Sequence, residues 1–291
     1  LVERFNTRAQ AKFYIEHSGA DFIDYEKEDY VFKKSLEIIQ NKISSHLKFK
    51  IIERKYLPNF IFSESDIAVV VGQDGLVANT AKYLNGKPIL AINPDLDRYD
   101  GILMPYNITN FEKGLIKAVE FRASYQEVTM AEAILNNGQR LLAFNDFFIG
   151  PSSHISARYK ITFNNKSEAQ SSSGIIISTG AGSTGWLSSL INMSNGINSA
   201  FCEKTDNISM KMRWDDNKLI FIVREPFQSK YSEISLTTGI ISNKLKLVVE
   251  SFMPQNGIIF SDGIEADYLN FNSGSIVEIG IAEQKAKIIN L

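Results

Sequence analysis

Two glycine-rich loops carry residue types that could bind a phosphate and act on a hydroxyl group. The first, Gly72-Gln73-Asp74-Gly75, directly follows the apolar run 67–71, and the second, Thr179-Gly180-Ala181-Gly182-Ser183-Thr184, follows the apolar run 174–177. Glycine lets the backbone approach a phosphate closely, so that exposed N–H groups can bind its oxygens. An aspartate beside such a loop can accept a hydroxyl proton or hold Mg²⁺. The two loops therefore point to phosphoryl transfer, with Asp74 as the reactive carboxylate.

Each of these segments also has a purely structural interpretation. The first loop can be a tight turn in which Asp74 caps the following helix, and the second can be a hairpin or a helix cap. Other features have equally simple explanations: an Asx turn at Asn145-Asp146, a β-turn at Asp262-Gly263 and a core position for Trp186. The ordered combination of the segments favours a nucleotide site over these separate alternatives.

The composition limits the classes of protein and partner. The chain has 291 residues, of which 44% are hydrophobic, and this is enough for one large domain or two. Its formal charge of −2 provides no basic field, so a nucleic-acid partner is not expected. The apolar runs are shorter than the ~20 residues that cross a bilayer, and we expect no membrane partner.

Cysteine and histidine usage also excludes some chemistry. Cys202 is the only cysteine, which rules out an intramolecular disulfide and fits a reducing compartment, so we expect the cytoplasm. His17, His46 and His154 show no paired spacing of the kind that binds zinc. Residues 1–10 lack a hydrophobic signal core. No metal site of the chain's own is predicted.

Strands and helices alternate in the first part of the chain. The apolar strand 67–71, a helix over 77–84 and the buried strand 88–92 form a βαβ unit, which favours a parallel sheet. Ligands of such sheets bind at the carboxyl ends of the strands, where Asp74 and Asn93-Pro94-Asp95 would lie. Further elements are expected as helices over 7–17, 30–46 and 111–122 and a strand over 48–54. The polar run 25–30 is interpreted as a solvated face.

Many short strands separated by Gly, Asn and Ser follow. They are expected at 125–135, 140–144, 156–163, 174–178, 219–223, 234–238, 244–249, 257–261 and 275–281. This pattern predicts a Rossmann-like α/β domain over 1–124 and a β-sandwich-like domain over 125–291. The C-terminal segment could pack either within the second domain or back on the first. A helix is expected over 185–193 and a loop over 194–211.

Four segments together resemble the NAD kinase family. They are VVVGQDGLVANTAKYL, AFNDFFIG, SSSGIIISTGAGSTGW and FSDGIEADYLNFNSGSIVEI, in this order and at these separations. The resemblance extends from about Phe60 onward. It is closest to the mitochondrial-type branch, which also carries Ser-Ser-Gly before a Thr-Gly-x-Gly-Ser loop. The same superfamily includes diacylglycerol and sphingosine kinases.

The resemblance implies an ATP-dependent phosphorylation of the 2′-hydroxyl of the NAD adenosine ribose to give NADP. Asp74 matches the aspartate that activates this hydroxyl, and Asn145 and Asp146 match the pair that binds the nucleoside. Mg²⁺ would arrive with ATP, and a homodimer or homotetramer is implied. The remaining binding residues that the resemblance implies are Gly72, Gln73, Gly75, Thr179, Ala181, Gly182, Ser183, Thr184 and Trp186.

The chain departs from the family pattern in both loops. Gln73 replaces the second glycine of the first loop and Leu76 its threonine, whereas Gly180 and Ala181 replace a proline and a threonine in the second. Ser173 stands where many members have an acidic residue that binds the second ribose. Three alternatives therefore stay open: a lipid or sugar kinase of the same superfamily, a non-catalytic NAD or NADP sensor, and an α/β scaffold that binds proteins.

Overall fold

A parallel βαβ unit begins the larger of two sheets. In the computed structural model, which describes residues 5–202, 207–264 and 267–291, β1 (Ala68–Val71) runs parallel to β2 (Pro88–Asn93). Helix α4 (Asp74–Ala81) connects the two strands. The short strand β3 (Tyr106–Asn107) pairs with the end of β2. The predicted parallel unit is confirmed.

Strand β15 (Ile276–Ile289) joins the parallel strands to the antiparallel part of this sheet. Its end, at Lys287 and Ile288, is parallel to the start of β2, and most of its length is antiparallel to β4 (Tyr125–Leu135). The order β1-β2-β15-β12-β7-β8, with β3, β4 and β5 off this path, makes nine strands. The other members are β5 (Arg140–Ala143), β7 (Ala157–Phe163), β8 (Lys166–Ser172) and β12 (Leu247–Ser251).

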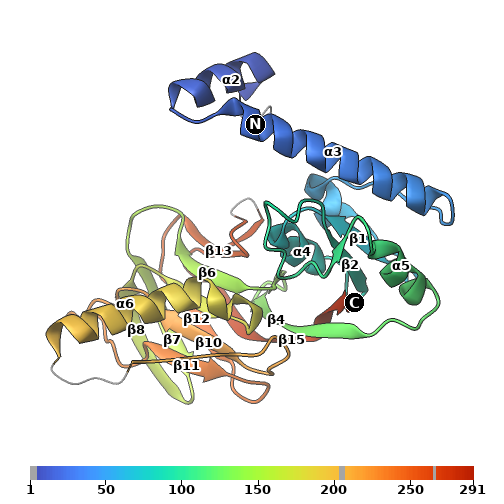
Figure 1. Cartoon of the computed structure of the whole chain (residues 1–291). Coiled ribbons are helices and arrows are strands. Elements are labelled where there is room, and N and C mark those ends of the chain that lie inside the picture. Colours follow the sequence, from blue (N-terminus) through green and yellow to red (C-terminus); the bar gives the residue numbers. More distant parts are fainter. Residues whose placement is uncertain (1–4, 203–206, 265–266) are drawn as a thin grey trace.

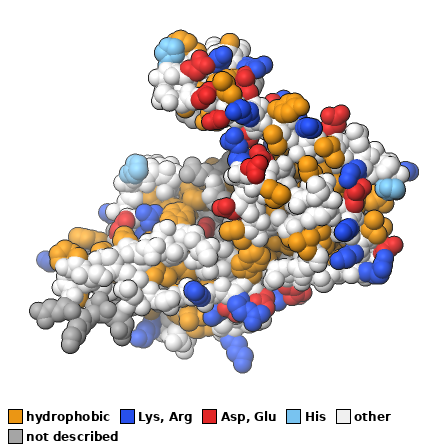
Figure 2. Space-filling view, viewed as in Figure 1, with side chains coloured by type: hydrophobic (Ala, Val, Ile, Leu, Met, Phe, Trp, Pro, Cys, Tyr) orange, Lys and Arg blue, Asp and Glu red, His pale blue; other side chains and the backbone are white. Residues whose placement is uncertain are grey.

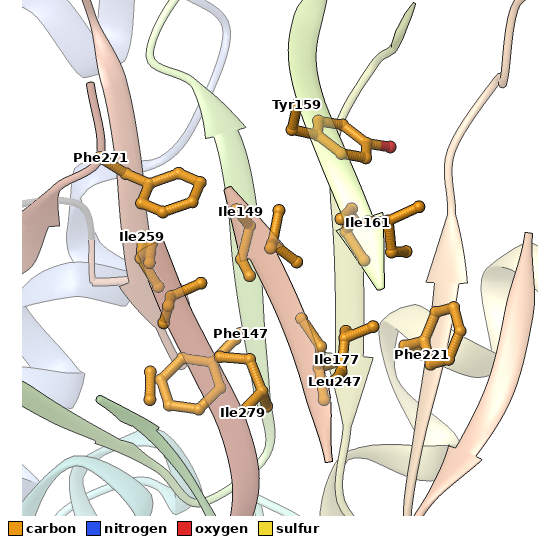
Figure 3. Close-up of a cluster of buried hydrophobic side chains, with 14 of the residues drawn as sticks. Phe147, Ile149, Tyr159, Ile161, Ile177, Phe221, Leu247, Ile259, Phe271 and Ile279 are labelled. Carbon is orange, nitrogen blue, oxygen red and sulfur yellow. The ribbon is translucent and has the colours of Figure 1, made fainter. Parts of the chain in front are cut away.

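A second, antiparallel sheet packs against the first. Its order is β11-β10-β9-β6-β13-β14. These strands are β6 (Asp146–Pro151), β9 (Ile175–Ser178), β10 (Leu219–Val223), β11 (Thr238–Ile241), β13 (Gly257–Ser261) and β14 (Tyr268–Asn270). Figure 3 shows Phe147 and Ile177 of this sheet in one apolar layer with Tyr159 and Ile279 of the other. Burying each such side chain stabilises the fold by about 1.5–3 kcal/mol, and the predicted α/β plus β-sandwich-like class is confirmed.

Helices cover both faces of the parallel strands. Ile89 and Ala91 of β2 pack in one cluster with α4, whereas Leu90 and Ile92 pack in another with α3 (Phe22–Ser44) and α5 (Phe111–Val119). Because both faces are buried, every residue of this strand is apolar up to its last position. The position of the domain boundary near residue 124 stays a prediction.

The N-terminal helices α2 (Arg8–His17) and α3 form an arm. Asp21 caps α3 by accepting a 2.8 Å hydrogen bond from the Ile23 amide. Ile39 and Ile43 near the C-terminal end of α3 are buried against the parallel strands, and α2 extends away from the body (Figure 1). Figure 2 shows charged side chains of both signs spread over this arm. Within the described ranges no helix is both long and apolar enough to cross a membrane.

Several predicted strands and helices are confirmed, and some of them have the predicted bounds. The strands predicted at 125–135, 219–223 and 257–261 are β4, β10 and β13, and the helix predicted over 7–17 is α2 with Thr7 as its cap. The helix predicted over 111–122 is confirmed as α5, which ends at Val119. Glu265 and Ala266 of the last motif lie outside the described residues.

Other predictions are wrong at boundaries or in type. Helix α3 begins at Phe22 rather than 30 because Asp21 caps it, and α4 begins at Asp74 rather than 77. Residues 48–53 form no strand, and a 3₁₀ helix, η1 (Arg54–Asn59), follows them. The strand predicted at 234–238 lies at 238–241, where it pairs with β10. Helix α6 (Trp186–Phe201) continues into the predicted loop 194–211 as far as Phe201, and β6, β8 and β14 were not predicted.

Candidate active site

Asp74 is the first residue of α4, and the backbone of a neighbouring loop holds its carboxylate. Oδ1 accepts a 2.8 Å hydrogen bond from the Leu103 amide, and Oδ2 accepts one of 3.2 Å from the Ile102 amide. The half-buried side chain lines a cavity of 310 Å³. The cavity is lined by Gln73, Asp74, Gly75, Arg98, Tyr99, Asp100 and Ile102. The carboxylate is therefore oriented in advance and still faces open space.

The loop that holds Asp74 depends on Asn93 and Gly101. The Asn93 amide nitrogen donates to the Tyr99 carbonyl at 2.8 Å, and its oxygen accepts from the Asp95 amide at 3.0 Å. Gly101 has φ +63°, and a Cβ there would lie 2.6 Å from Asn93 Nδ2. Only glycine fits this position without a shift. The strand-end loop predicted at Asn93-Pro94-Asp95 thus supports the Asp74 cavity.

The arm also contacts this loop. Glu28 of α3 accepts hydrogen bonds from the Tyr99 hydroxyl and, at 3.3 Å, from Arg98 Nη1. Arg98 Nη2 donates to the Asp24 carbonyl at 3.2 Å, and Ser35 Oγ donates to the Pro94 carbonyl at 3.0 Å. Burial, followed by the Glu28 hydrogen bond, raises the pKa of Tyr99. The interpretation of the run 25–30 as a solvated face is wrong for Glu28, because its partners lie far along the chain.

Asn145 and Asp146 lie where β5 passes into β6, next to the second glycine-rich loop. The Thr179 amide donates to the Asn145 carbonyl at 2.9 Å, and Thr179 Oγ1 donates to the Phe144 carbonyl at 2.6 Å. A Cβ at Gly182 would lie 2.1 Å from the Asn145 carbonyl oxygen. The structure therefore brings the predicted pair and the predicted loop together, and Gly182 is needed for this close contact.

The polar groups of the second loop are partly used within the protein. Thr179 Oγ1 also accepts from the Gly182 amide at 3.2 Å, and the buried Ser183 hydroxyl donates to the Gly180 carbonyl at 2.7 Å. Thr184 is exposed and Ala181 half-buried, so they lie on the accessible side of the 3₁₀ helix η2 (Ala181–Thr184). Ala181 and Thr184 are therefore accessible to a ligand, whereas the side chains of Thr179 and Ser183 are buried.

Asp262 is a site residue that the sequence analysis assigned to a simple turn. Its Oδ1 accepts from the Asn145 amide at 2.6 Å and from the Asp146 amide at 3.4 Å, and its Oδ2 accepts from the Phe144 amide at 3.1 Å. Burial, together with the negative charge of Asp262, raises the pKa of Asp146 to about 7. Burial also raises the pKa of Asp262, partly offset by Lys82. The signal in the sequence was Asp-Gly directly after a buried strand.

Trp186 lies in a second cavity, of 620 Å³, on the outer face of the second sheet. Its ring stacks on Phe148 at a centroid distance of 5.9 Å, and the Arg224 guanidinium lies 5.7 Å from its centre. Ser173 and His154 also line this cavity. Since side chains two apart in a strand share a face, Asp146 and Phe148 point to the same side of β6.

The described part of the chain contains no cluster of three or more His, Cys, Asp or Glu side chains that could hold a metal ion. Asp74 is the acidic residue of the first cavity with both oxygens bonded to backbone amides, and Asp100 lines the same cavity. These two carboxylates suit contact with a metal that phosphate oxygens already hold, rather than a complete protein cage.

Comparison with known proteins finds similarity to NAD kinases. No family model matches the chain. NAD kinases of Saccharolobus islandicus and Saccharolobus solfataricus are 26% identical over 157 and 158 residues, which is 54% of this chain. The matched stretch spans only 57% of the length of these relatives.

Solved structures show the same architecture. Yeast NADH kinase complexed with NADH has a TM-score of 0.57 at 17% identity, over 78% of this chain and 62% of that one. An NAD kinase from Archaeoglobus fulgidus in complex with ATP has a TM-score of 0.57 at 20% identity, over 87% and 88%. The chain therefore shares its fold, a mixed sheet packed against an antiparallel sheet, with these two proteins. The resemblance to the NAD kinase family is confirmed, and the chain is a relative of the NAD kinases. Its place near the mitochondrial-type branch stays a prediction.

Proposed function

We propose that this protein is an NAD kinase, which transfers the γ-phosphoryl group of ATP to the 2′-hydroxyl of the adenosine ribose of NAD. The observation that carries the proposal is the Asp74 carboxylate, fixed by the Ile102 and Leu103 amides at the edge of a cavity of 310 Å³. A general base must be oriented before the reaction, and the two amide hydrogen bonds already orient the Asp74 carboxylate.

In the proposed reaction the 2′-oxygen attacks the γ-phosphorus, and the proton of the 2′-hydroxyl passes to Asp74. The bond between the γ-phosphorus and the β,γ-bridging oxygen breaks, and ADP leaves. Mg²⁺ arriving with ATP would neutralise the phosphate charge. Arg98 lines the same cavity, and its positive charge suits the phosphates of the donor.

The nucleoside would be held by the second group of residues. Asn145 and Asp146 provide amide and carboxylate groups for hydroxyl and base atoms, and Ala181 and Thr184 lie on the accessible side of the adjoining loop. The cavity at Trp186, of 620 Å³, would take the other half of the dinucleotide, with an aromatic face for stacking. Gly72, Gln73 and Gly75 would shape the edge at the reacting hydroxyl.

Two further expectations belong to this proposal. The cytoplasm suits a chain whose single cysteine, Cys202, is exposed and free. A homodimer or homotetramer is proposed from the family resemblance, and the exposed Ile240 side chain of the edge strand β11 suits a subunit contact.

A panel of acceptors tests the proposal. The protein is incubated with γ-labelled ATP and, separately, with NAD, NADH, diacylglycerol and a sugar. We expect label in NADP or NADPH. Label in the lipid or the sugar would instead establish the superfamily alternative, and saturable NAD binding without labelled product would establish a sensor in which Gln73 and Leu76 have removed turnover.

A further inference from the structure

Asp262 is buried under the strand entry that carries Asn145 and Asp146. Its side chain is only 2% exposed, and both oxygens accept backbone hydrogen bonds, from the amides of Phe144, Asn145 and Asp146 at 3.1, 2.6 and 3.4 Å. Its φ of +55° places it in the left-handed region, which a turn imposes on it. One carboxylate therefore fixes three consecutive amides on the path from β5 to β6.

Lys82, at the C-terminal end of α4, compensates this buried charge. It directly follows the last residue of α4, its side chain is 2% exposed, and its Nζ lies 3.8 Å from Asp262 Oδ2 and 3.5 Å from Asp267 Oδ2. Nζ also donates to Ser261 Oγ at 2.8 Å, and the Tyr83 hydroxyl donates to Asp267. A buried carboxylate without a partner is strongly unfavourable, so the pair ties α4 to the turn after β13.

The two ends of α4 thus serve the two halves of the proposed site. Its first residue is Asp74, and Lys82 after its last residue meets Asp262, which holds the Asn145 and Asp146 backbone. A shift of α4 relative to the second sheet would move the proposed base and the proposed nucleoside contacts together. Loops that position a ligand need such support to keep their geometry.

We infer that Asp262, paired with Lys82, is a positioning residue that fixes the nucleoside-binding backbone at Asn145 and Asp146 and couples it to the helix that carries Asp74. The inference rests on the proposed function only for the identity of the ligand. Asp262 itself is too deeply buried to touch NAD and acts through the backbone that it holds.

Asp262→Asn tests this role, with Asp267→Asn as the matched control. Both changes remove a carboxylate beside Lys82, but the Asp267 side chain is 30% exposed and bonds to Lys82 and Tyr83 rather than to the 144–146 backbone. The readouts are hydrogen exchange of the amides of 144–146, the Kd for NAD and kcat. For Asp262→Asn we expect exchange at least about tenfold faster, a Kd raised about tenfold and kcat within about threefold; the control should change each by less than about threefold.

Unchanged exchange and affinity in Asp262→Asn, or equal losses in the control, would overturn the inference. If Asp262→Asn does not fold, the double variant Lys82→Met/Asp262→Asn, which removes both buried charges, is measured in its place with the same expectations. Failure of the wild-type protein to bind NAD would contradict the proposed function, whereas the exchange of 144–146 would still decide the positioning role.

Discussion

The Asp74 carboxylate accepts a 2.8 Å hydrogen bond from the backbone amide of Leu103, which lies in the loop between β2 and β3. The helix that presents the proposed base and the loop that orients it are therefore different segments of the chain.

Gly101→Ala should displace the loop that orients Asp74. The new Cβ would lie 2.6 Å from Asn93 Nδ2 at a φ of +63°, so the loop must move. We expect a stability loss of about 1–2 kcal/mol and a kcat at least about tenfold lower. Thermal unfolding and steady-state kinetics measure both. Gly138→Ala shares the positive φ but meets no atom within 4 Å, so it should lose stability and keep its kcat.

Glu28→Gln should weaken the hold of the arm on the Asp74 cavity. Glutamine has nearly the shape of glutamate but lacks the negative charge of the carboxylate that accepts hydrogen bonds from Arg98 and Tyr99. Since Arg98 is partly exposed, stability should change by less than about 1 kcal/mol. The KM for ATP should rise about threefold to tenfold as Arg98 becomes less ordered. Glu26 on the same helix pairs with Arg8, so Glu26→Gln should leave this KM unchanged. An equal rise in both variants would refute the role of the Glu28 contact.

The affinity for NAD should depend on the ionisation of Asp146. Burial and the charge of Asp262 raise its pKa to about 7, and an ionised carboxylate is the better acceptor for ribose hydroxyls. The Kd for NAD should therefore rise as the pH falls below about 7 and level off above it. Isothermal titration between pH 5.5 and 8.5 measures this. In Asp146→Asn the slope should disappear.

The same shift predicts a pH effect on stability. A carboxylate whose folded-state pKa lies above its unfolded value binds more protons when folded, so stability falls as the pH rises from about 4 to about 7. Asp146→Asn removes the group that causes this loss of stability. The variant should unfold at a higher temperature than the wild type at pH 8, whereas the two unfolding temperatures should be similar at pH 4. A lower unfolding temperature at pH 8 would contradict the buried, raised-pKa carboxylate.

Gly182→Ala should separate the second loop from Asn145. Its Cβ would lie 2.1 Å from the Asn145 carbonyl oxygen, which backbone atoms cannot accommodate without a shift. We expect a Kd for NAD at least about tenfold higher. Gly196→Ala in α6 meets open space, and replacing a helical glycine should stabilise it by about 0.5–1 kcal/mol. Equal NAD affinity in the two variants would remove the loop from the site.

The sequence predicted those elements whose pattern is local. The buried strands β2 and β10 are short apolar runs, and the partly buried strand β4 shows alternation near its end; both patterns are typical of strands. The predicted helix ended at residue 193 because Asn and Ser beyond it are typical of loops, yet the Asn195 side chain bonds to the carbonyl and the amide of Ile208, both at 2.9 Å, and the helix continues to Phe201. Tertiary packing decided this boundary against local propensity.

The supporting contacts of the site could not be predicted from local pattern. Glu28 meets Arg98 and Tyr99, and Asp262 meets Phe144 to Asp146, across large separations in sequence. Each residue in isolation fits a solvated helix or a turn. The two glycine-rich loops could be proposed as site loops from the sequence because their order and separation resemble those of a known family. The residues that support these loops can be recognised only in the folded chain.

The central claim is tested most directly by measuring NADP formation from NAD and Mg-ATP with the wild-type protein and with Asp74→Asn. The variant keeps an oxygen that can accept the Leu103 amide but cannot take the proton of the 2′-hydroxyl. The account predicts turnover by the wild type, a kcat at least about 100-fold lower in the variant and a Kd for NAD within about threefold. Equal turnover by both proteins, or none by the wild type, would contradict it.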